Sequence, residues 1–307
     1  MSGRIYEFVQ LDVFTQAPLA GNPLAIFTDA RGLNDGEMQA LAREMNLSET
    51  TFILPRDRTT EAREGKKVRI FTVEEELPFA GHPTLGTAVY LYAAKADSNG
   101  SAEITLDLKA GKIPVRFTPN SENAGRNRVD GQVFGEMCQR DPEFRPALSR
   151  EDVARVIGIA VDEICSEWPI QPVSTGLTFT IVPFRNKQTL SNLKFTYAQA
   201  AEFLKNTGAN FFYFLCPERC EGRLEARARM FFYGGEDPAT GSAAGCAASW
   251  MVQHGVAKTD EQVLIRQGID CRRPSELYVR ATLDGERVSN VRVGGYAVEI
   301  LRGTVAL

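Results

Sequence analysis

The stretch Glu236-Asp237-Pro238-Ala239-Thr240-Gly241-Ser242-Ala243-Ala244-Gly245 connects a strand-like run at residues 226–233 to a run of small residues at 243–252. A strand-to-helix turn rich in Gly, Ser and Thr leaves backbone N–H groups unpaired at the positive end of the helix dipole, which suits an anion. Because Asp237 stands at the start of this turn, the stretch predicts a place where a carboxylate ligand is held next to a proton donor or acceptor. Taken alone, the stretch leaves open a capped core helix with an incidental Asp.

The two halves of the chain match each other at an offset of 160 residues. Without a gap, this offset pairs Arg69, Phe71, Glu76, Pro78 and Gly81 with Arg229, Phe231, Glu236, Pro238 and Gly241. Further upstream it pairs Gln39, Ala40, Asn46 and Phe52 with Gln199, Ala200, Asn206 and Phe212. A long-period match in only two copies predicts two like domains, each running helix, strand, strand, glycine turn, helix.

Polar and ionisable side chains stand where the two copies differ. The same offset matches Glu49 to Ala209, Leu77 to Asp237 and His82 to Ser242. Core positions tend to stay alike between copies, whereas each of these positions gives one copy a group that the other lacks. We therefore expect a shared site, with the two glycine turns facing each other across a pseudo-twofold axis.

The composition favours a two-domain protein with a small ligand. The chain has 307 residues, 43% of them hydrophobic, which is enough for two domains of roughly 150 residues. A net charge of −4 argues against a nucleic-acid partner, because neutralising phosphates needs clustered Lys and Arg. The start of the chain has no apolar signal core, and no run approaches the ~18 apolar residues of a membrane span. We therefore expect a cytoplasmic protein with no membrane partner.

The cysteines predict no metal site and no disulfide framework. The six are scattered along the chain, and a large chain without an export signal should keep them reduced. Cys216 and Cys220 are the one close pair, and with two histidines in the whole chain a zinc site is not expected.

Glu49 follows a predicted helix. Asn34 and Glu37 have the spacing of a capping box, and the apolar positions after them predict a helix through about Met45. Glu49 then stands at the entry to an apolar strand at 51–54. A solvated surface carboxylate is the alternative for a lone Glu in this place.

His82 stands at the start of a second predicted helix. Pro83 suits the first helical turn, where its missing N–H costs nothing. The helix dipole disfavours the imidazolium at this end and should lower the pKa of His82. A neutral capping residue is the alternative for His82, and His254 is expected at the C-terminal end of its helix.

A polar stretch predicts where the two domains are joined. Residues 119–131 have few apolar anchors and are predicted to be a linker.

A hairpin is predicted just before this linker. Its strands are the runs at 103–108 and 113–117, and Pro114 inside the second run predicts an edge strand.

Five stretches together resemble the PhzF family, named for the phenazine-biosynthesis isomerase. They are residues 21–25, 48–50, 81–83, 174–176 and 237–242, in this order. The resemblance covers essentially the whole chain. It implies an α+β fold like that of diaminopimelate epimerase: two pseudo-equivalent domains, each a curled, mostly antiparallel sheet around a central helix. It places one domain at 1–120 plus about 294–307 and the other at 128–293, with the site in the cleft between them and a homodimer as the assembly.

The resemblance also implies roles for individual residues. Glu49 matches the catalytic carboxylate that carries a proton, and His82, Asp237 and Ser242 match residues that bind substrate and assist the transfer. Gly81 and Gly241 match the backbone donors of the two helix ends, and Gly176 is placed at the pocket wall. The family's named reaction acts on trans-2,3-dihydro-3-hydroxyanthranilate.

General chemistry agrees with these roles. Moving a proton between two carbons of a small cyclic carboxylic acid, without a cofactor, needs a base near neutral pH and a partner for the developing enolate-like charge. A Glu enclosed in an apolar cleft has its pKa raised by desolvation, so we expect Glu49 to take and return the proton. Two helix N-termini would hold the substrate carboxylate.

Other classes of protein remain open at this point. A two-thiol racemase or epimerase would need a cysteine at each glycine turn, and neither turn has one, although Cys246 lies one turn into its helix. A non-catalytic small-molecule-binding protein of the same fold is the other alternative. A nicotinamide or flavin enzyme is not expected, because no Gly-x-Gly-x-x-Gly turn follows a strand.

Overall fold

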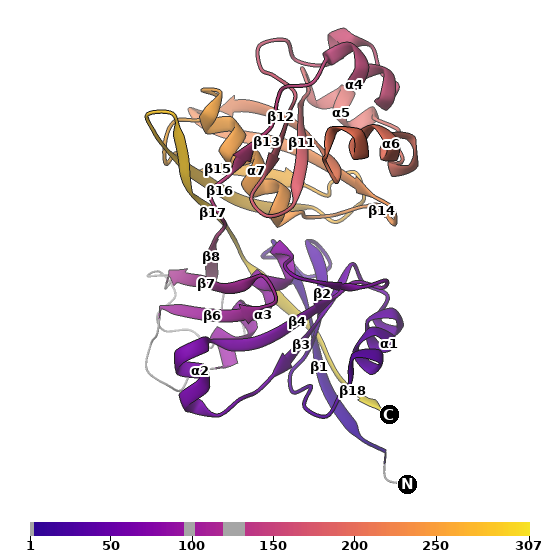
Figure 1. Ribbon diagram of the computed structural model, residues 1–307, viewed down its shortest axis with the longest axis vertical. Coiled ribbons are helices and arrows are strands. Elements are labelled where there is room, and N and C mark those ends of the chain that lie inside the picture. Colours follow the sequence, from indigo (N-terminus) through magenta and orange to yellow (C-terminus); the bar gives the residue numbers. More distant parts are fainter. Residues whose placement is uncertain (1–2, 95–101, 119–132) are drawn as a thin grey trace. The chain divides into compact units, whose positions relative to one another are not determined.

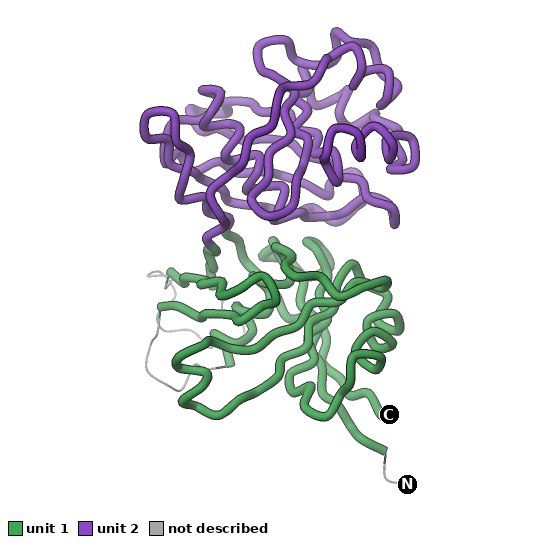
Figure 2. Tube along the Cα trace, in the orientation of Figure 1, with its two compact units in different colours: residues 1–137, 294–307 green, residues 138–293 purple. Residues whose placement is uncertain are grey.

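The structure is a computed structural model that describes residues 3–94, 102–118 and 133–307. The chain forms two compact units, one of Met1–Met137 with Gly294–Leu307 and one of Cys138–Val293 (Figure 2). The linker expected at 119–131 lies outside the described residues, as do the domain limits expected at 120 and 128.

Unit 1 is built on a sheet with strand order β18-β1-β2-β3-β4-β6-β7-β8 (Figure 1). Neighbouring strands are antiparallel except for β2–β3 and β4–β6, which are parallel. The elements are β1 (Ile5–Val13), β2 (Asn22–Phe27), α1 (Asp35–Met45), β3 (Glu49–Leu54), α2 (Arg58–Glu64), β4 (Lys66–Phe71), β5 (Glu76–Leu77), α3 (Gly81–Ala94), β6 (Glu103–Leu108), β7 (Gly111–Thr118), β8 (Phe134–Cys138) and β18 (Ala297–Ala306).

Helix α3 is the central helix of unit 1. Ten of its 14 residues are buried, so it has no solvent-facing stripe. A Cβ on Gly86 would lie 2.7 Å from side-chain carbons of Val13 and Leu24, so glycine allows the helix to approach β1 and β2 closely. Helix α1 packs through a separate core, in which Met38 contributes to a cluster with the stacked rings of Phe27 and Phe52.

Unit 2 repeats this plan. Its sheet has the order β9-β10-β11-β12-β13-β15-β16, with parallel pairs at β11–β12 and β13–β15. Eleven of the 13 residues of its central helix α7 are buried. The elements are β9 (Glu143–Phe144), α4 (Arg150–Ile157), the 3-10 helix η2 (Val161–Glu163), β10 (Gln171–Ser174), β11 (Thr178–Pro183), α5 (Lys187–Asn192), α6 (Tyr197–Thr207), β12 (Phe211–Cys220), β13 (Arg223–Phe232), β14 (Gly235–Glu236), α7 (Gly241–Gln253), β15 (Val263–Gln267), β16 (Ser275–Asp284) and β17 (Arg287–Gly295).

The internal repeat is visible in the ladders of the two sheets. From β1 to β7 and from β10 to β16 the strand pairs run antiparallel, parallel, antiparallel, parallel, antiparallel. Phe71 faces Glu76 as Phe231 faces Glu236, and the central helices begin at Gly81 and Gly241. The offset of 160 residues is therefore confirmed from β4 to the start of the central helix.

Upstream of β4 the predicted offset is wrong by two residues. The capping boxes are Asn34 with Glu37 and Thr196 with Gln199, so helices α1 and α6 correspond at an offset of 162. Phe52 faces Arg69 while Phe214 faces Arg229, which gives the same offset for β3 and β12. The sequence matches found upstream therefore do not join equivalent positions; these are the matches of Gln39, Ala40, Asn46 and Phe52 with Gln199, Ala200, Asn206 and Phe212.

The slip has a local cause. Unit 1 connects β3 to β4 through helix α2, whereas unit 2 joins the longer strands β12 and β13 by a hairpin turn at Glu221 and Gly222. Counted between equivalent ladder positions, the connection in unit 2 is two residues shorter than the one in unit 1. Consequently Glu49, which faces Leu24, corresponds to Phe211, which faces Phe179, and not to Ala209. The second copy still lacks an acid at this place.

Strand β7 is not an edge strand over its whole length. Val115 to Thr118 pair with β8 as well as with β6, which corrects the expectation drawn from Pro114. Pro114 itself pairs with Thr105 of β6 and lies one residue before the ladder to β8 begins. A proline is tolerated there because its missing N–H leaves no ladder bond unmade on that side.

Candidate active site

Glu49 and His82 come together in unit 1. Glu49 is the first residue of β3, directly after the turn that ends α1 at Asn46, whose left-handed backbone redirects the chain. His82 is the second residue of α3, and its Nδ1 lies 3.6 Å from Glu49 Oε2 and 3.4 Å from Asn22 Nδ2. The side chain of Glu49 is 16% exposed, which excludes the fully solvated alternative.

The imidazole of His82 is buried and neutral. Burial lowers the pKa of His82 from 6.5 to about 3, while a hydrogen bond with the Pro23 backbone acts weakly in the opposite direction. The direction expected from the helix dipole is correct, but desolvation is the main cause. Among the described residues, none forms a hydrogen bond with His82 Nε2. A buried ring nitrogen that lacks a hydrogen-bond partner is uncommon, which makes this position a candidate for function.

The burial of His82 predicts a pH-dependent stability. The unfolded chain takes up a proton near pH 6.5 and the folded chain only near pH 3, so the stabilisation is complete above pH 6.5 and is lost as the pH falls toward 3. Between pH 7 and pH 5 this group should cost about 2 kcal/mol of the free energy of unfolding. When His82→Gln is unfolded with urea at pH 7 and at pH 5, its free energy of unfolding should fall between the two pH values by about 2 kcal/mol less than that of the wild type.

His254 provides the matched control for this measurement. It ends helix α7, as expected, and its Nε2 lies 2.7 Å from Gln171 Oε1. Burial lowers its pKa as well, but the ring is only partly enclosed. His254→Gln should therefore change the pH dependence less than His82→Gln, and equal losses in the wild type and in His82→Gln would contradict the assignment.

Asp237 lies in the turn between β14 and α7 in unit 2 and is held by a polar network. Thr240 Oγ1 donates to Asp237 Oδ2 at 2.6 Å, and the Asp237 carboxyl group is buried. Gln267 Nε2 donates to the Asp237 carbonyl at 2.8 Å and to Thr240 Oγ1 at 2.9 Å. Thr240 stands at the N-cap position of α7, but its side chain makes no capping bond, because the hydroxyl is used on Asp237.

The other expected binding residues take these places. Gly81 and Gly241 are the first residues of α3 and α7, and both are buried. Ser242, half-buried, is the second residue of α7 and corresponds to His82 of α3. Gly176 is exposed in the turn between β10 and β11 with φ +140°, and its N–H donates to Ser174 Oγ.

Several residues of the site region were not found from the sequence. Gln267 and Tyr213 hold the Asp237 turn, and Gln139 Nε2 donates to the Gly241 carbonyl at 2.9 Å. Thr175 Oγ1 in turn donates to Gln139 Oε1 at 2.7 Å. The sequence contained one indication that Gln267 matters. Val263, Ile265 and Gln267 share the inward face of one strand, and a Gln at such a position needs buried hydrogen-bond partners.

The structure weakens the two-thiol alternative. Cys246 is buried in α7, and burial raises the pKa of its thiol to about 11. A thiol with this pKa is protonated at neutral pH and is a poor base. All six cysteines are free thiols.

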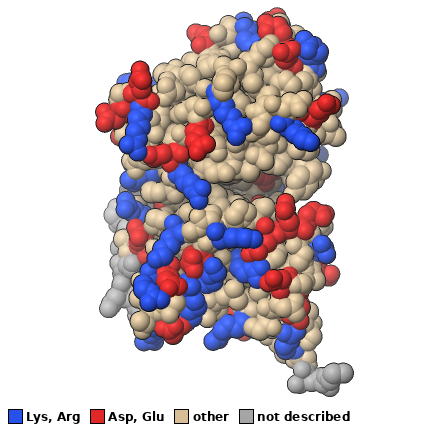
Figure 3. Space-filling model, viewed as in Figure 1, with Lys and Arg blue, Asp and Glu red and all other residues tan. Residues whose placement is uncertain are grey.

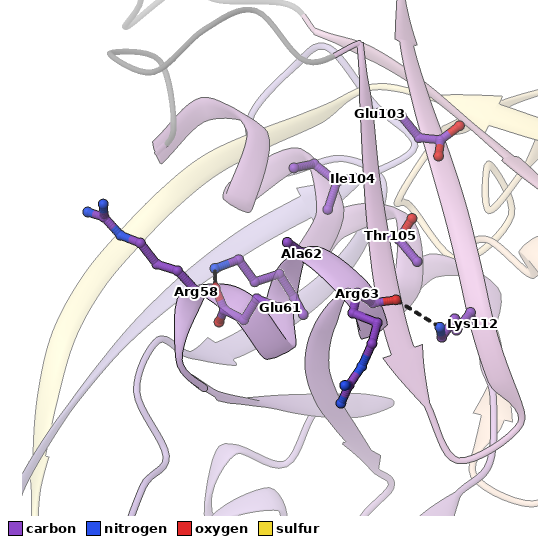
Figure 4. A pocket seen from close by; sticks show the side chains of 10 residues that line it. Arg58, Glu61, Ala62, Arg63, Glu103, Ile104, Thr105 and Lys112 are labelled. Atoms are coloured by element: carbon purple, nitrogen blue, oxygen red, sulfur yellow. Dashed lines mark hydrogen bonds and ion pairs between the residues drawn. The ribbon is translucent and has the colours of Figure 1, made fainter.

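A pocket of about 750 Å³ in unit 1 does not contain the expected site residues. Its walls come from α2 and the neighbouring strands, and Figure 4 shows Lys112 pointing to the Arg63 carbonyl, at 2.9 Å. Lys66 of the same pocket is paired with Glu61. Most of these charges are already compensated, so we do not assign the pocket to the chemistry.

Surface charge, helix length and the grouping of possible metal ligands concern the kinds of partner that the protein can bind. On the face drawn in Figure 3, basic and acidic side chains both occur over each unit. In residues 3–94, 102–118 and 133–307, no helix is long and apolar enough to cross a membrane. Within the same described ranges, no three His, Cys, Asp or Glu residues are grouped so as to hold a metal ion.

Comparison with solved structures defines the class of fold. A Pseudomonas aeruginosa structure described as a predicted epimerase matches 98% of this chain and 99% of its own, with a TM-score of 0.80 and 34% identity. A PhzF-family phenazine biosynthesis protein from Bacillus anthracis matches 99% of this chain and 100% of its own, with a TM-score of 0.84 and 26% identity. A hydroxyproline epimerase from Agrobacterium vitis, only 11% identical, shares the fold with a TM-score of 0.66 over 99% of this chain and 93% of its own. The molecule therefore has the α+β, epimerase-like fold that was expected.

Sequence comparison narrows the class to a family. The trans-2,3-dihydro-3-hydroxyanthranilate isomerase of Pseudomonas aeruginosa is 35% identical over 307 residues, covering 99% of this chain and all of the relative. The sequence profile of the phenazine biosynthesis-like proteins, PhzC-PhzF, matches residues 11–303. The chain belongs to this family, and it is an isomerase. The resemblance inferred from the five stretches is thereby confirmed.

Proposed function

We propose that the protein is a cofactor-independent isomerase that moves a proton between two carbons of a small cyclic carboxylic acid. The relative that is named a trans-2,3-dihydro-3-hydroxyanthranilate isomerase supports this substrate class. An isomerisation changes neither the composition nor the oxidation state of the substrate, so a proton acceptor that returns what it takes completes the reaction without a redox partner.

The pairing of Glu49 with His82 is the observation that carries the proposal. The carboxylate is mostly enclosed, and an imidazole lies 3.6 Å from it. A carboxylate can both accept a proton and give it back, so Glu49 in this place can serve as the proton carrier. Glu49 removes the proton from one carbon and delivers it to another on the same face of the ring.

His82 and Asp237 assist the transfer in this proposal. His82 is neutral at physiological pH, so it offers a hydrogen bond rather than a full charge. Its Nε2 and the Asp237 carboxyl group bind polar groups of the substrate and serve any second transfer. Gly81, Gly241, Ser242 and Gly176 contribute to binding, with the two helix N-termini attracting the substrate carboxylate.

Conversion of trans-2,3-dihydro-3-hydroxyanthranilate tests the proposal. Purified protein is mixed with this compound and, in parallel, with other small cyclic amino acids and enoic acids, and NMR follows the ring protons. We expect a shifted double bond in at least one cyclic acid, with no added cofactor. Tight binding of these acids without conversion or proton exchange would instead support a binding protein.

The proposal also includes a homodimer in the cytoplasm. Sedimentation of the purified protein and fractionation of cells that produce it test these two points. A monomer at micromolar concentration would contradict the first of them.

A further inference from the structure

A chain of hydrogen bonds in unit 2 ends on the Asp237 carboxyl group. Tyr213 donates its hydroxyl to Gln267 Oε1 at 3.0 Å, and the Thr240 N–H donates to the same oxygen at 3.2 Å. Gln267 Nε2 reaches the Asp237 carbonyl at 2.8 Å and Thr240 Oγ1 at 2.9 Å. Gln267 is fully buried, and all its amide hydrogen-bonding positions are used.

Two backbone groups fix the direction of every bond in this chain. The Thr240 N–H can only donate, so the amide atom facing it is Oε1, and the Asp237 carbonyl can only accept, so the atom facing it is Nε2. Since Nε2 donates to Thr240 Oγ1, the hydroxyl proton of Thr240 is directed away from Gln267. It points at Asp237 Oδ2, 2.6 Å away. Asp237 Oδ2 is thus held as a hydrogen-bond acceptor.

Unit 1 has apolar residues at three of the same four positions and Thr51 at the fourth. Lys66 faces Leu106 as Ala226 faces Ile265, so Leu108 stands where unit 2 has Gln267. At the offsets established above, Leu77, Ala80 and Thr51 stand where unit 2 has Asp237, Thr240 and Tyr213. Leu108 and Ala80 are buried, and α3 begins at Gly81 as α7 begins at Gly241. The fold of one unit therefore forms without the polar chain.

We propose that Gln267 and Thr240 are positioning residues that hold the Asp237 carboxyl group in one orientation and in its ionised form. The inference depends on the role proposed above for Asp237 in the reaction. Neither side chain needs to touch the substrate. A hydrogen bond donated to a carboxylate favours its charged form, so Thr240 sets the proton affinity of Asp237, and Gln267 sets the direction of Thr240.

The other titratable groups near Asp237 leave this assignment intact. Burial raises the pKa of Tyr213 well above 10 and that of Cys271 to about 11, and Asp237 contributes to both shifts. Cys246 is protonated for the same reason. Glu236, next along the chain, is paired with Arg229, which also lies 3.5 Å from Asp270. Tyr213 and the two thiols are uncharged at neutral pH and do not compete for the Thr240 proton.

The test combines a titration that needs no substrate with steady-state kinetics. The full chain, labelled with ¹³C at Asp carboxyl carbons, is titrated by NMR as wild type, Thr240→Ala, Thr240→Ser, Gln267→Leu and Tyr213→Phe. Ala and Leu are the residues that unit 1 has at these positions, and Ser keeps the hydroxyl. The Asp237 pKa should rise by about one unit in Thr240→Ala and Gln267→Leu. It should stay within ~0.3 units in Thr240→Ser and Tyr213→Phe, because the backbone alone still orients Gln267.

The kinetic arm uses whichever cyclic acid the wild type converts. We expect kcat to fall about tenfold in Thr240→Ala and Gln267→Leu, with KM within about twofold, and the double variant to lose no more than the worse single one. If Gln267→Leu does not fold, the inference is tested by the comparison of Thr240→Ala with Thr240→Ser. An unchanged Asp237 pKa in Thr240→Ala overturns the inference, even where the wild type converts a substrate. A shifted pKa in a protein that converts nothing supports the hydrogen-bond chain and contradicts the proposed function instead.

Discussion

Glu49→Gln is expected to lower turnover by about 10²- to 10⁴-fold, the range seen when a general base is removed. Gln has nearly the same shape as Glu, so the fold and the enclosure of the side chain beside His82 should be kept. An amide cannot accept a proton from carbon, so the chemical step fails while binding persists. Turnover is measured by NMR or absorbance, and binding of the same cyclic acid by calorimetry.

Glu44 supplies the control for this variant. It lies five residues upstream, in helix α1, and its side chain is exposed. Glu44→Gln makes the same chemical change outside the site and should leave both turnover and binding within about twofold. Near-normal turnover in Glu49→Gln would exclude Glu49 as the proton carrier.

Arg229→Met is expected to lower the free energy of unfolding of unit 2 by about 3–5 kcal/mol, the usual cost of removing one partner of a buried ion pair. Arg229 and Glu236 form two parallel hydrogen bonds of 2.9 and 2.8 Å, with side chains 8% and 11% exposed. Arg229 Nη1 also donates to the carbonyls of Leu190 and Leu193 at the end of α5. Its loss would leave a buried carboxylate and these carbonyls without their donor.

The repeat provides a matched control for this prediction. Arg69 and Glu76 form the same two bonds in unit 1, at 2.8 and 2.9 Å, but both side chains are 20% exposed. Water can replace part of what is lost there, so Arg69→Met should cost only about 1–2 kcal/mol. Urea unfolding is followed by tryptophan fluorescence for unit 2, which holds both Trp168 and Trp250, and by hydrogen exchange of backbone amides for unit 1, which holds neither. Equal losses in the two variants would show that burial does not set the strength of this pair.

Much of the fold could be predicted because local signals agree with the tertiary structure. The capping box of Asn34 and Glu37 sets the start of α1 as expected, and a second capping box, of Thr196 and Gln199, sets the start of α6. The glycine turns before α3 and α7 begin these helices at the predicted residues. The two-residue slip upstream could not be seen, because matching letters without a gap do not reveal that α2 and a β-hairpin bridge equivalent strands with different lengths.

The sequence suggested candidate residues for the site but not the contacts that support them. Glu49 and His82 were singled out by the differences between the two copies and by the family resemblance, and the structure brings the two side chains together. The neutrality of His82 arises mainly from enclosure, which a sequence does not show, rather than from the dipole. Gln267 lies 30 residues from Asp237, and only the register of β13 with β15 brings the two together.

A single-turnover experiment with labelled substrate tests the central claim most directly. Wild-type enzyme in excess over substrate, in light water, converts a cyclic acid that carries deuterium on the ring carbon that loses its proton. If one carboxylate, Glu49, takes and returns that hydrogen, the product carries deuterium above background on the carbon that gains it. Product with hydrogen from water alone at that carbon, and with all the label in the solvent, would contradict transfer by a single shuttling carboxylate.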